Sequence, residues 1–137
     1  ALALSQLQRL DTLIKMRQKN AKYLIKKLQK FKEITFHLSP KDYVHVYQLF
    51  TIMLPNTKTR NELSNFLTKK GVMSKIFFVA IHKTNFYKKL KSNYGDLSTT
   101  ENICDRMLSL PMYPDLKETE MDFISKSIEE FFSSRSK

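Results

Sequence analysis

The chain has 137 residues and a formal net charge of +11, from 24 basic and 13 acidic side chains. An apolar fraction of 42%, with ten Phe and six Tyr, is that of a globular domain with one hydrophobic core and excludes a disordered tail. Two glycines and one cysteine exclude a glycine-rich phosphate loop and an internal disulfide, and no apolar run approaches the ~18 residues of a membrane-spanning helix.

A long amphipathic helix is predicted first, over residues 2–32. Lysines lie on one side of it, and apolar residues recur at heptad spacing on the other. Arg17 interrupts one apolar row, which favours packing on the domain's own sheet, or on a missing neighbour, over a coiled-coil dimer. The helix opens at Ala1 without a capping residue, so we expect the chain to be part of a longer polypeptide. The apolar side contains Leu7, Leu10, Ile14, Ala21, Leu24, Leu28 and Phe31.

The middle of the chain is predicted to contain three strands and one helix. Residues 34–38 and 44–54 are rich in β-branched and aromatic side chains, and the second segment is apolar on both faces, as a central strand is. The tetrapeptide TRNE at 59–62 has the form of a capping box that opens a helix, and Gly71 is placed to end it in the left-handed conformation. The apolar segment 72–80 predicts another buried strand.

The C-terminal part is predicted to be helical. A short helix over 85–90 and a turn at 94–96 precede a second capping box, STTE at 98–101, which opens a helix to about Leu108. Apolar residues at helical spacing then predict a last helix that frays from Ser133. The order helix–strand–strand–helix–strand–helices predicts the α+β class, with a small sheet covered by helices. The buried side of the last helix is expected to contain Met121, Ile124, Ile128 and Phe131.

Five segments carry further information through their order and spacing. They are ALALSQLQRLDTLIKMRQKNA at the start, then HVYQLFTIML, TRNELSNFLTKKGV, IFFVAIHKTNFYKKL and finally LSLPMYPDL. Together they resemble the C-terminal part of the DegT/DnrJ/EryC1/StrS family of pyridoxal-phosphate (PLP) dependent sugar aminotransferases. The resemblance covers residues 1–132. It implies a single domain over 1–137, the small C-terminal domain of the aspartate-aminotransferase fold type, with a mostly antiparallel sheet covered by helices and preceded by a long helix.

The resemblance also implies a function for the complete protein. Family members use PLP to move an amino group, commonly from glutamate, onto a keto-sugar attached to a nucleotide, for surface polysaccharides or antibiotics. The lysine that holds PLP belongs to the large domain, upstream of Ala1, so no cofactor and no catalytic residue are expected in this chain. Expected partners are the missing large domain, a second copy in a homodimer and the nucleotide-sugar. The alternative, from the residues alone, is a non-catalytic basic interaction module with the same fold.

Three residues are candidates for substrate binding. His82 matches the final histidine of the family's His-Tyr-Pro-Pro-Leu-His segment, whose loop faces the cleft in related enzymes; the alternative is a histidine that packs a turn. Lys75 is a candidate point charge for a nucleotide-sugar phosphate, or a solvated edge lysine. Tyr113 is the third candidate, although packing in the core is the simpler interpretation. Phe78-Val79-Ala80 replaces the family's Tyr-Pro-Pro, which weakens the expected substrate contacts of this loop.

Other reactive side chains are interpreted as structural. Lys41 follows a sequence similar to the family's PLP-lysine motif, but an extra residue and the missing glycines make it a loop lysine. His37 and His45 lack Cys or carboxylate partners at zinc-ligand spacing. Cys104 is expected to be a small buried helix residue. A single cysteine favours a reducing compartment, and we expect a cytoplasmic protein.

The positive charge is interpreted as a lysine-rich solvated surface, because the lysines spread along the chain and form no block. Basic and aromatic residues interleave over 77–91, as in single-strand nucleic-acid binders. However, Phe77 and Phe78 lie in an apolar segment where core burial explains them better, and no zinc-finger, helix-turn-helix or RNA-recognition motif accompanies them. Nucleic-acid binding is therefore disfavoured, and no membrane partner is expected.

Overall fold

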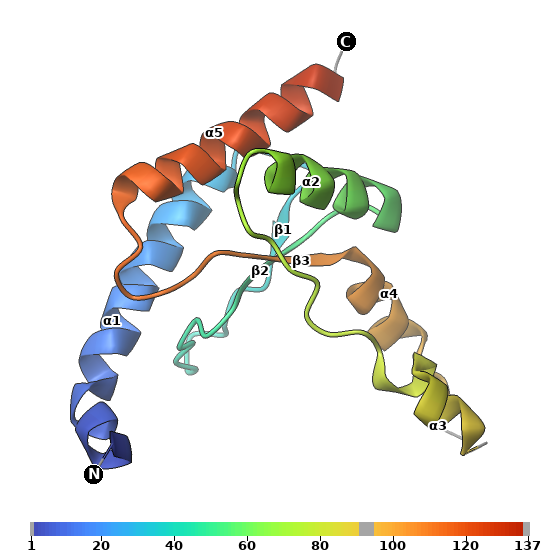
Figure 1. Ribbon diagram of the computed structural model, residues 1–137, viewed down its shortest axis with the longest axis horizontal. Helices are drawn as coiled ribbons and strands as arrows, with labels where there is room; N and C mark the ends of the chain where they lie inside the picture. Colours follow the sequence, from blue (N-terminus) through green and yellow to red (C-terminus); the bar gives the residue numbers. More distant parts are fainter. Residues whose placement is uncertain (1, 91–94, 136–137) are drawn as a thin grey trace.

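A computed structural model of the protein describes residues 2–90 and 95–135 (Figure 1). It confirms the predicted α+β class: helices cover a small three-stranded antiparallel sheet. The elements in chain order are α1 (Leu2–Leu28), β1 (Thr35–Phe36), β2 (Phe50–Met53), α2 (Thr57–Lys69), the 3-10 helix η1 (Ile81–Lys83), α3 (Asn85–Lys89), α4 (Ser98–Arg106), β3 (Met107–Leu110) and α5 (Glu118–Arg135).

The strand β2 is the centre of the sheet. It pairs antiparallel with β1, where Thr35 lies opposite Met53, and with β3, where Ile52 lies opposite Leu108. On the far side of β3 a single bridge joins Lys75 to Ser109. The β2–β3 pairing brings together segments that are more than fifty residues apart in the sequence, so it depends on the folded core.

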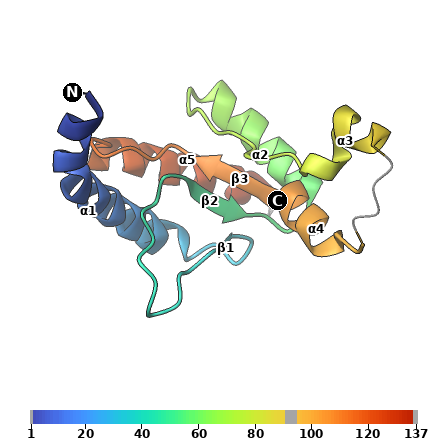
Figure 2. The same ribbon diagram turned by 90° about the horizontal axis from the view of Figure 1, so that it is seen from below.

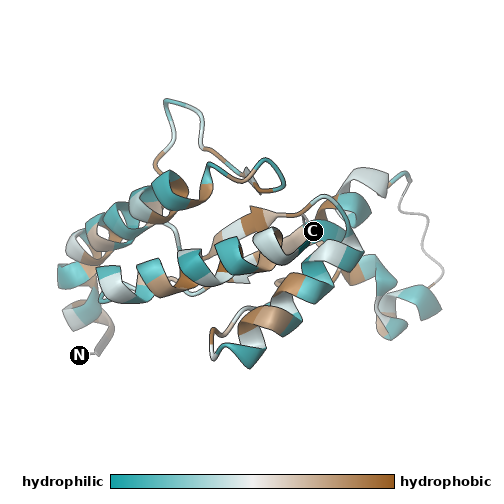
Figure 3. Cartoon of the chain, turned by 90° about the horizontal axis from the view of Figure 1, so that it is seen from above, coloured by the Kyte–Doolittle hydropathy of each residue, from teal (hydrophilic) through white to brown (hydrophobic). Residues whose placement is uncertain are grey.

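The core lies between the sheet and three helices. Figures 1 and 2 show α5 lying across α1, and α5 also packs against α2. Along the helices, hydrophilic and hydrophobic residues alternate, as amphipathic helices on a shared core require (Figure 3). The predicted buried side of α5 is confirmed. The fully or nearly fully buried core residues include Leu24, Leu28, Ile52, Leu54, Leu63, Leu67, Leu108, Met121 and Ile128.

The apolar side of α1 is buried only along its second half. Ala21, Leu24 and Leu28 are 0% exposed, whereas Leu7 and Leu10 are 64% and 44% exposed. Figure 1 shows the first turns of α1 projecting beyond the sheet. The second half of α1 is therefore buried within its own domain, but it packs mainly on α5 and not on the sheet as predicted. The helix ends at Leu28, before the predicted end at about Lys32.

Two predicted strands are wrong in extent. Only Phe50–Met53 of the segment 44–54 is a strand, because the chain turns at Tyr47, whose φ is +48°, and Val44 is 78% exposed. The segment 72–80 is no regular strand: it contacts β3 through the single bridge at Lys75. Apolar composition predicted burial along both segments, but no residue of 44–49 or 73–79 is fully buried, because no other element in the described part of the chain covers these stretches.

The aromatic pair at 77–78 also differs from its predicted core position. Phe78 is 68% exposed and Phe77 is only partly buried. Cys104 was predicted to be buried, but it is partly exposed. The helix that contains Cys104, α4, ends two residues earlier than expected, because Met107 begins the strand β3, which the sequence interpretation missed.

The two predicted capping boxes are wrong, while the predicted end of α2 at Gly71 is confirmed. Helix α2 begins earlier, after Asn56, whose Oδ1 accepts a hydrogen bond from the Thr59 amide at 2.9 Å. At α4 the Ser98 amide donates to Oδ1 of Asp96 at 2.9 Å. Gly71 has φ +80°, and the Val72 amide donates to the Leu67 carbonyl at 2.9 Å, so α2 ends in a Schellman motif.

The remaining local predictions agree with the structure where it describes the residues. The short helix predicted over 85–90 is α3. The predicted turn at 94–96 begins at Tyr94, which lies outside the described residues, while Gly95 has φ +67°. Helix α5 continues through Arg135, so the predicted fraying at Ser133 is wrong for 133–135; the last two residues lie outside the described range.

A polar cluster joins the C-terminal half of α1 to α5. The Asp122 carboxylate accepts a hydrogen bond from the Tyr23 hydroxyl at 2.9 Å and lies 2.9 Å from Nζ of Lys27. Lys27, and secondly Tyr23, lower the pKa of Asp122 below its ordinary value. Just after the end of α1, Lys30 pairs with Glu129 of α5 at 2.7 Å. The cluster makes the α1–α5 contact sensitive to acid.

We expect the domain to lose thermal stability in acid through Asp122. A carboxyl whose pKa is lower in the folded state contributes stability above its unfolded pKa of about 3.9, and this contribution is lost as the pH falls through the folded value. The midpoint temperature of unfolding, measured by circular dichroism from about pH 5 downward, should fall less steeply in Asp122→Asn than in the wild type. Asp11→Asn, at an exposed position of α1, is the control and should retain the wild-type slope. An unchanged slope in Asp122→Asn would contradict this role.

Candidate functional site

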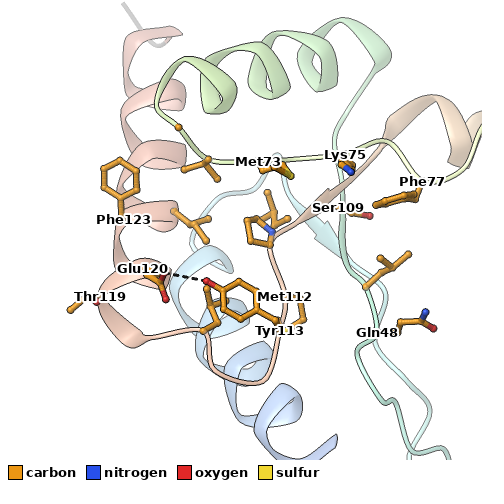
Figure 4. A pocket seen from close by; sticks show the side chains of 17 residues that line it. Gln48, Met73, Lys75, Phe77, Ser109, Met112, Tyr113, Thr119, Glu120 and Phe123 are labelled. Carbon is orange, nitrogen blue, oxygen red and sulfur yellow. Dashed lines mark hydrogen bonds between the residues drawn. The ribbon is translucent and has the colours of Figure 1, made fainter. Parts of the chain in front are cut away.

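An open groove of about 700 Å³ lies beside the C-terminal end of β3. One wall is the segment 71–77, and the other is formed by the turn 111–116 and the first turns of α5 (Figure 4). Most of the wall is apolar, and a few polar groups converge on it, which is the usual character of a ligand site. The polar side chains that line the groove are Gln48, Lys75, Ser109, Tyr113, Thr119 and Glu120.

Tyr113 is held in the groove through its backbone. The side-chain amide of Asn20, a residue of α1 that is 5% exposed, donates to the carbonyls of Tyr113 and Pro114 at 3.0 Å each. This anchors the turn after β3 to α1 and leaves Tyr113, which lines the groove, 42% exposed. The prediction that this ring packs in the core is therefore wrong, because the buried anchor is the main chain of the turn.

The Tyr113 hydroxyl forms a pair with Glu120. It donates to Oε1 of Glu120 at 3.1 Å, and Oε2 accepts from the Lys117 amide at 2.8 Å (Figure 4). The pKa of Glu120 is lowered, mainly by the hydrogen bond from the Lys117 amide. The pKa of Tyr113 is raised, first by partial desolvation and then by its hydrogen bond to Glu120. At neutral pH the groove therefore presents a protonated phenol beside an ionised carboxylate, which suits hydroxyl-rich ligands.

Lys75 lies on the other wall of the same groove. Its backbone amide and carbonyl are bonded to Ser109 at 3.0 and 2.8 Å, which fixes the lysine to the edge of the sheet. Its Nζ lies 5.8 Å from the centre of the Phe77 ring, and Figure 4 shows both side chains at the groove. Within residues 2–90 and 95–135 no ion pair of Lys75 is found, so its charge is available to an anionic ligand.

His82 lies outside this groove. It is part of η1, and its Nε2 is 2.8 Å from Oε1 of Glu101 on α4. The side chain of His82 is 17% exposed. The structure thus brings Lys75 and Tyr113 together in one cavity and places His82 in a separate polar cluster.

Sequence reasoning missed Glu120 and Gln48. Glu120 lies three residues after Lys117, the residue that precedes α5, so its position as an acidic side chain of the first turn could have been recognised. Gln48 was assigned to a strand that begins only at Phe50, and no local pattern places it at the groove.

Other candidates form no comparable site. A second cavity of about 450 Å³ is lined by His37, His45 and several aromatic rings, and His45 Nδ1 accepts the Tyr47 amide at 2.9 Å. No group of three potential metal ligands occurs among the residues that the structure describes. Lys41 lies in an exposed turn, as predicted for a loop lysine. No described helix is both long enough and apolar enough to cross a membrane.

The residues that line the groove are not suited to hold PLP. PLP requires a lysine for its aldehyde, a carboxylate for its ring nitrogen and a cradle of donors for its phosphate. The groove's lysine lies over Phe77, and its one lining carboxylate, Glu120, is already bonded to Lys117 and Tyr113. We therefore derive no step of transamination from these residues.

Comparison with known proteins gives a consistent result. The pattern of the DegT/DnrJ/EryC1/StrS aminotransferase family matches residues 1–129. GDP-perosamine synthase of Escherichia coli O157:H7 is 27% identical over 135 residues, which are 98% of this chain and 36% of that protein. The chain thus spans about a third of that relative's length.

Solved structures show the same fold. A DegT DnrJ EryC1 StrS aminotransferase from Brucella abortus is 27% identical, with a TM-score of 0.81 over 93% of this chain and 33% of its own length. Helicobacter pylori PseC, an aminotransferase involved in the biosynthesis of pseudoaminic acid, is 23% identical, with a TM-score of 0.87 over 97% of this chain and 36% of its own length.

Proposed function

This chain belongs to the DegT/DnrJ/EryC1/StrS aminotransferase family, and we propose that it is the small C-terminal domain of a PLP-dependent aminotransferase acting on a nucleotide-linked keto-sugar. The similar proteins support the proposal, because one is a GDP-perosamine synthase and another takes part in pseudoaminic acid biosynthesis. Since the chain spans about a third of their length, the remaining two thirds of such an enzyme would contain a separate large domain.

The main support for the proposal is the groove that both Lys75 and Tyr113 line. These residues come from segments 38 positions apart, and both were candidates for substrate binding on the basis of the sequence. Lys75 would bind a phosphate of the nucleotide as a point charge. Tyr113 and Glu120 would bind sugar hydroxyls, since the phenol can donate or accept and the carboxylate accepts. The apolar wall around them would exclude water from the bound sugar.

The cofactor would be held by the large domain. When bound, PLP supplies the electron sink that lets an amino group be transferred. The part played by this chain is to bind and orient the sugar-nucleotide and to close one side of the cleft. On this proposal the isolated chain catalyses no transamination. A homodimer, a cytoplasmic location and a role in polysaccharide biosynthesis belong to the same proposal.

The test is to express the complete reading frame that contains these residues, and in parallel the 137-residue chain. With glutamate, the complete protein should convert PLP to its amine form, and with a nucleotide-linked keto-sugar it should convert the amine form back and release an amino sugar. Absorbance of the cofactor measures both conversions. The short chain should do neither. A complete reading frame that binds no PLP and transfers no amino group would refute the enzyme function and favour the basic interaction module.

A further inference from the structure

One carboxylate on α4 contacts two consecutive residues of η1. Oε1 of Glu101 lies 2.8 Å from Nε2 of His82, and Oε2 lies 2.9 Å from Nζ of Lys83. Lys83 also lies 3.7 Å from the carboxylate of Asp105, one helical turn further along α4. Both oxygens of Glu101 are therefore used, and each fixes a different side chain of η1.

Few apolar contacts hold η1 and α3 in place. Within residues 81–90 no apolar side chain is buried, and Ile81, Phe86 and Leu90 are 63%, 67% and 52% exposed. Figures 1 and 2 show α3 at the far end of the sheet from the N-terminal half of α1. With little apolar burial, directional hydrogen bonds set the orientation of such a segment.

Glu101 is free for this task because other groups complete the start of α4. The Ser98 amide is bonded to the Asp96 side chain, so the glutamate does not form the capping box that its position in STTE predicts. Its pKa is lowered, first by Lys83 and then by His82, so it is ionised at neutral pH. An ionised carboxylate accepts the Nε2–H of a histidine and orients the ring by a charge-assisted bond.

We infer that Glu101 is a positioning residue for His82: it fixes the orientation of the imidazole and, with Lys83, holds the segment 81–90 against α4. His82 is a candidate for substrate binding from the sequence and lies outside the groove; any contact of this histidine with the nucleotide-sugar, made from η1, rests on the proposed function. Glu101 touches no substrate in this scheme and acts through the ring that it orients and the segment that it holds.

The first experiment measures positioning in the 137-residue chain without cofactor. In Glu101→Ala, amide hydrogen exchange over 81–90 should rise about tenfold or more, the effect of losing a charge-assisted bond, and the imidazole ¹⁵N resonances of His82 should shift. Exchange in α5 and the sheet should stay unchanged. Asp105→Ala is the matched control: it removes a carboxylate from the same helix that contacts Lys83 but not His82, and the ring resonances should keep their positions.

A conservative variant keeps the test valid if Glu101→Ala fails to fold. Glu101→Gln retains the side-chain length and one acceptor oxygen but no charge, so exchange over 81–90 should rise by a smaller factor than in Glu101→Ala. Unchanged exchange and unchanged His82 resonances in both variants would overturn the inference.

Activity in the complete enzyme separates this inference from the proposed function. Glu101→Ala should raise KM for the nucleotide-sugar, and Glu101→Gln should restore part of the loss. If the resonances shift as expected but KM does not change, the substrate role of His82 is refuted and Glu101 remains the residue that positions the ring. If the complete protein lacks transaminase activity, the proposed function fails while the exchange result stands.

Discussion

Leu24→Ala should lower the free energy of unfolding by about 2–5 kcal/mol, the usual cost of truncating a leucine in a core. Leu24 is 0% exposed and lies in the second half of α1, where this helix packs on α5. The substitution removes buried methyl groups and leaves a cavity among side chains from several elements. Urea unfolding followed by circular dichroism measures the change.

The same helix provides a matched control. Leu7 occupies the same apolar side of α1 but is 64% exposed. Leu7→Ala removes the same atoms, and alanine is the better helix former, so the free energy of unfolding should change by less than about 0.5 kcal/mol. Equal losses in the two variants would show that the first half of α1 is buried in solution, in conflict with the structure.

Lys75→Met should raise KM for the nucleotide-sugar about 10- to 100-fold in the complete enzyme, if the proposed function is correct. A hydrogen bond to a charged group is worth about 1.5–3 kcal/mol, and each 1.4 kcal/mol is a factor of ten. We expect kcat to change much less, because a phosphate remote from the reacting carbon is bound equally in the ground and transition states. Steady-state kinetics with varied nucleotide-sugar separates the two constants.

Lys41→Met is the control for the lost charge. Lys41 lies in an exposed turn and does not line the groove, so both constants should keep their wild-type values. Tyr113→Phe adds a second test of the groove, because it deletes the hydroxyl that pairs with Glu120 and leaves the ring in place. A Lys75→Met enzyme with unchanged KM would remove the groove from the substrate site.

Local features could be read from the sequence because their causes lie within a few residues. Gly71 ends α2 as predicted, since the left-handed conformation and the two closing hydrogen bonds involve only residues 67–72. The buried side of α5 follows from helical periodicity alone. The capping boxes fit the same kind of pattern and were wrong, because Asn56 and Asp96 offered competing acceptors just upstream.

The candidate site was only partly predictable. Lys75 and Tyr113 were identified as single residues, but their shared groove depends on the pairing of 75 with 109 and on the Asn20 anchor. Glu101 was expected to cap its own helix, and its bonds to His82 and Lys83 could not be deduced from spacing. Hydrogen bonds between distant segments are decided by the folded backbone, and sequence patterns carry no direct signal for them.

The sequence by itself determined the α+β class, the long first helix, the end of α2, the apolar side of α5 and the family resemblance, because these depend on periodicity, on local turn chemistry or on motif order. Only the tertiary structure decided that β3 follows α4 directly, that segments 44–49 and 72–80 are no regular strands, and which polar groups share a groove. The physical reason is burial: the same apolar residues form a strand or an exposed loop according to whether another element covers them.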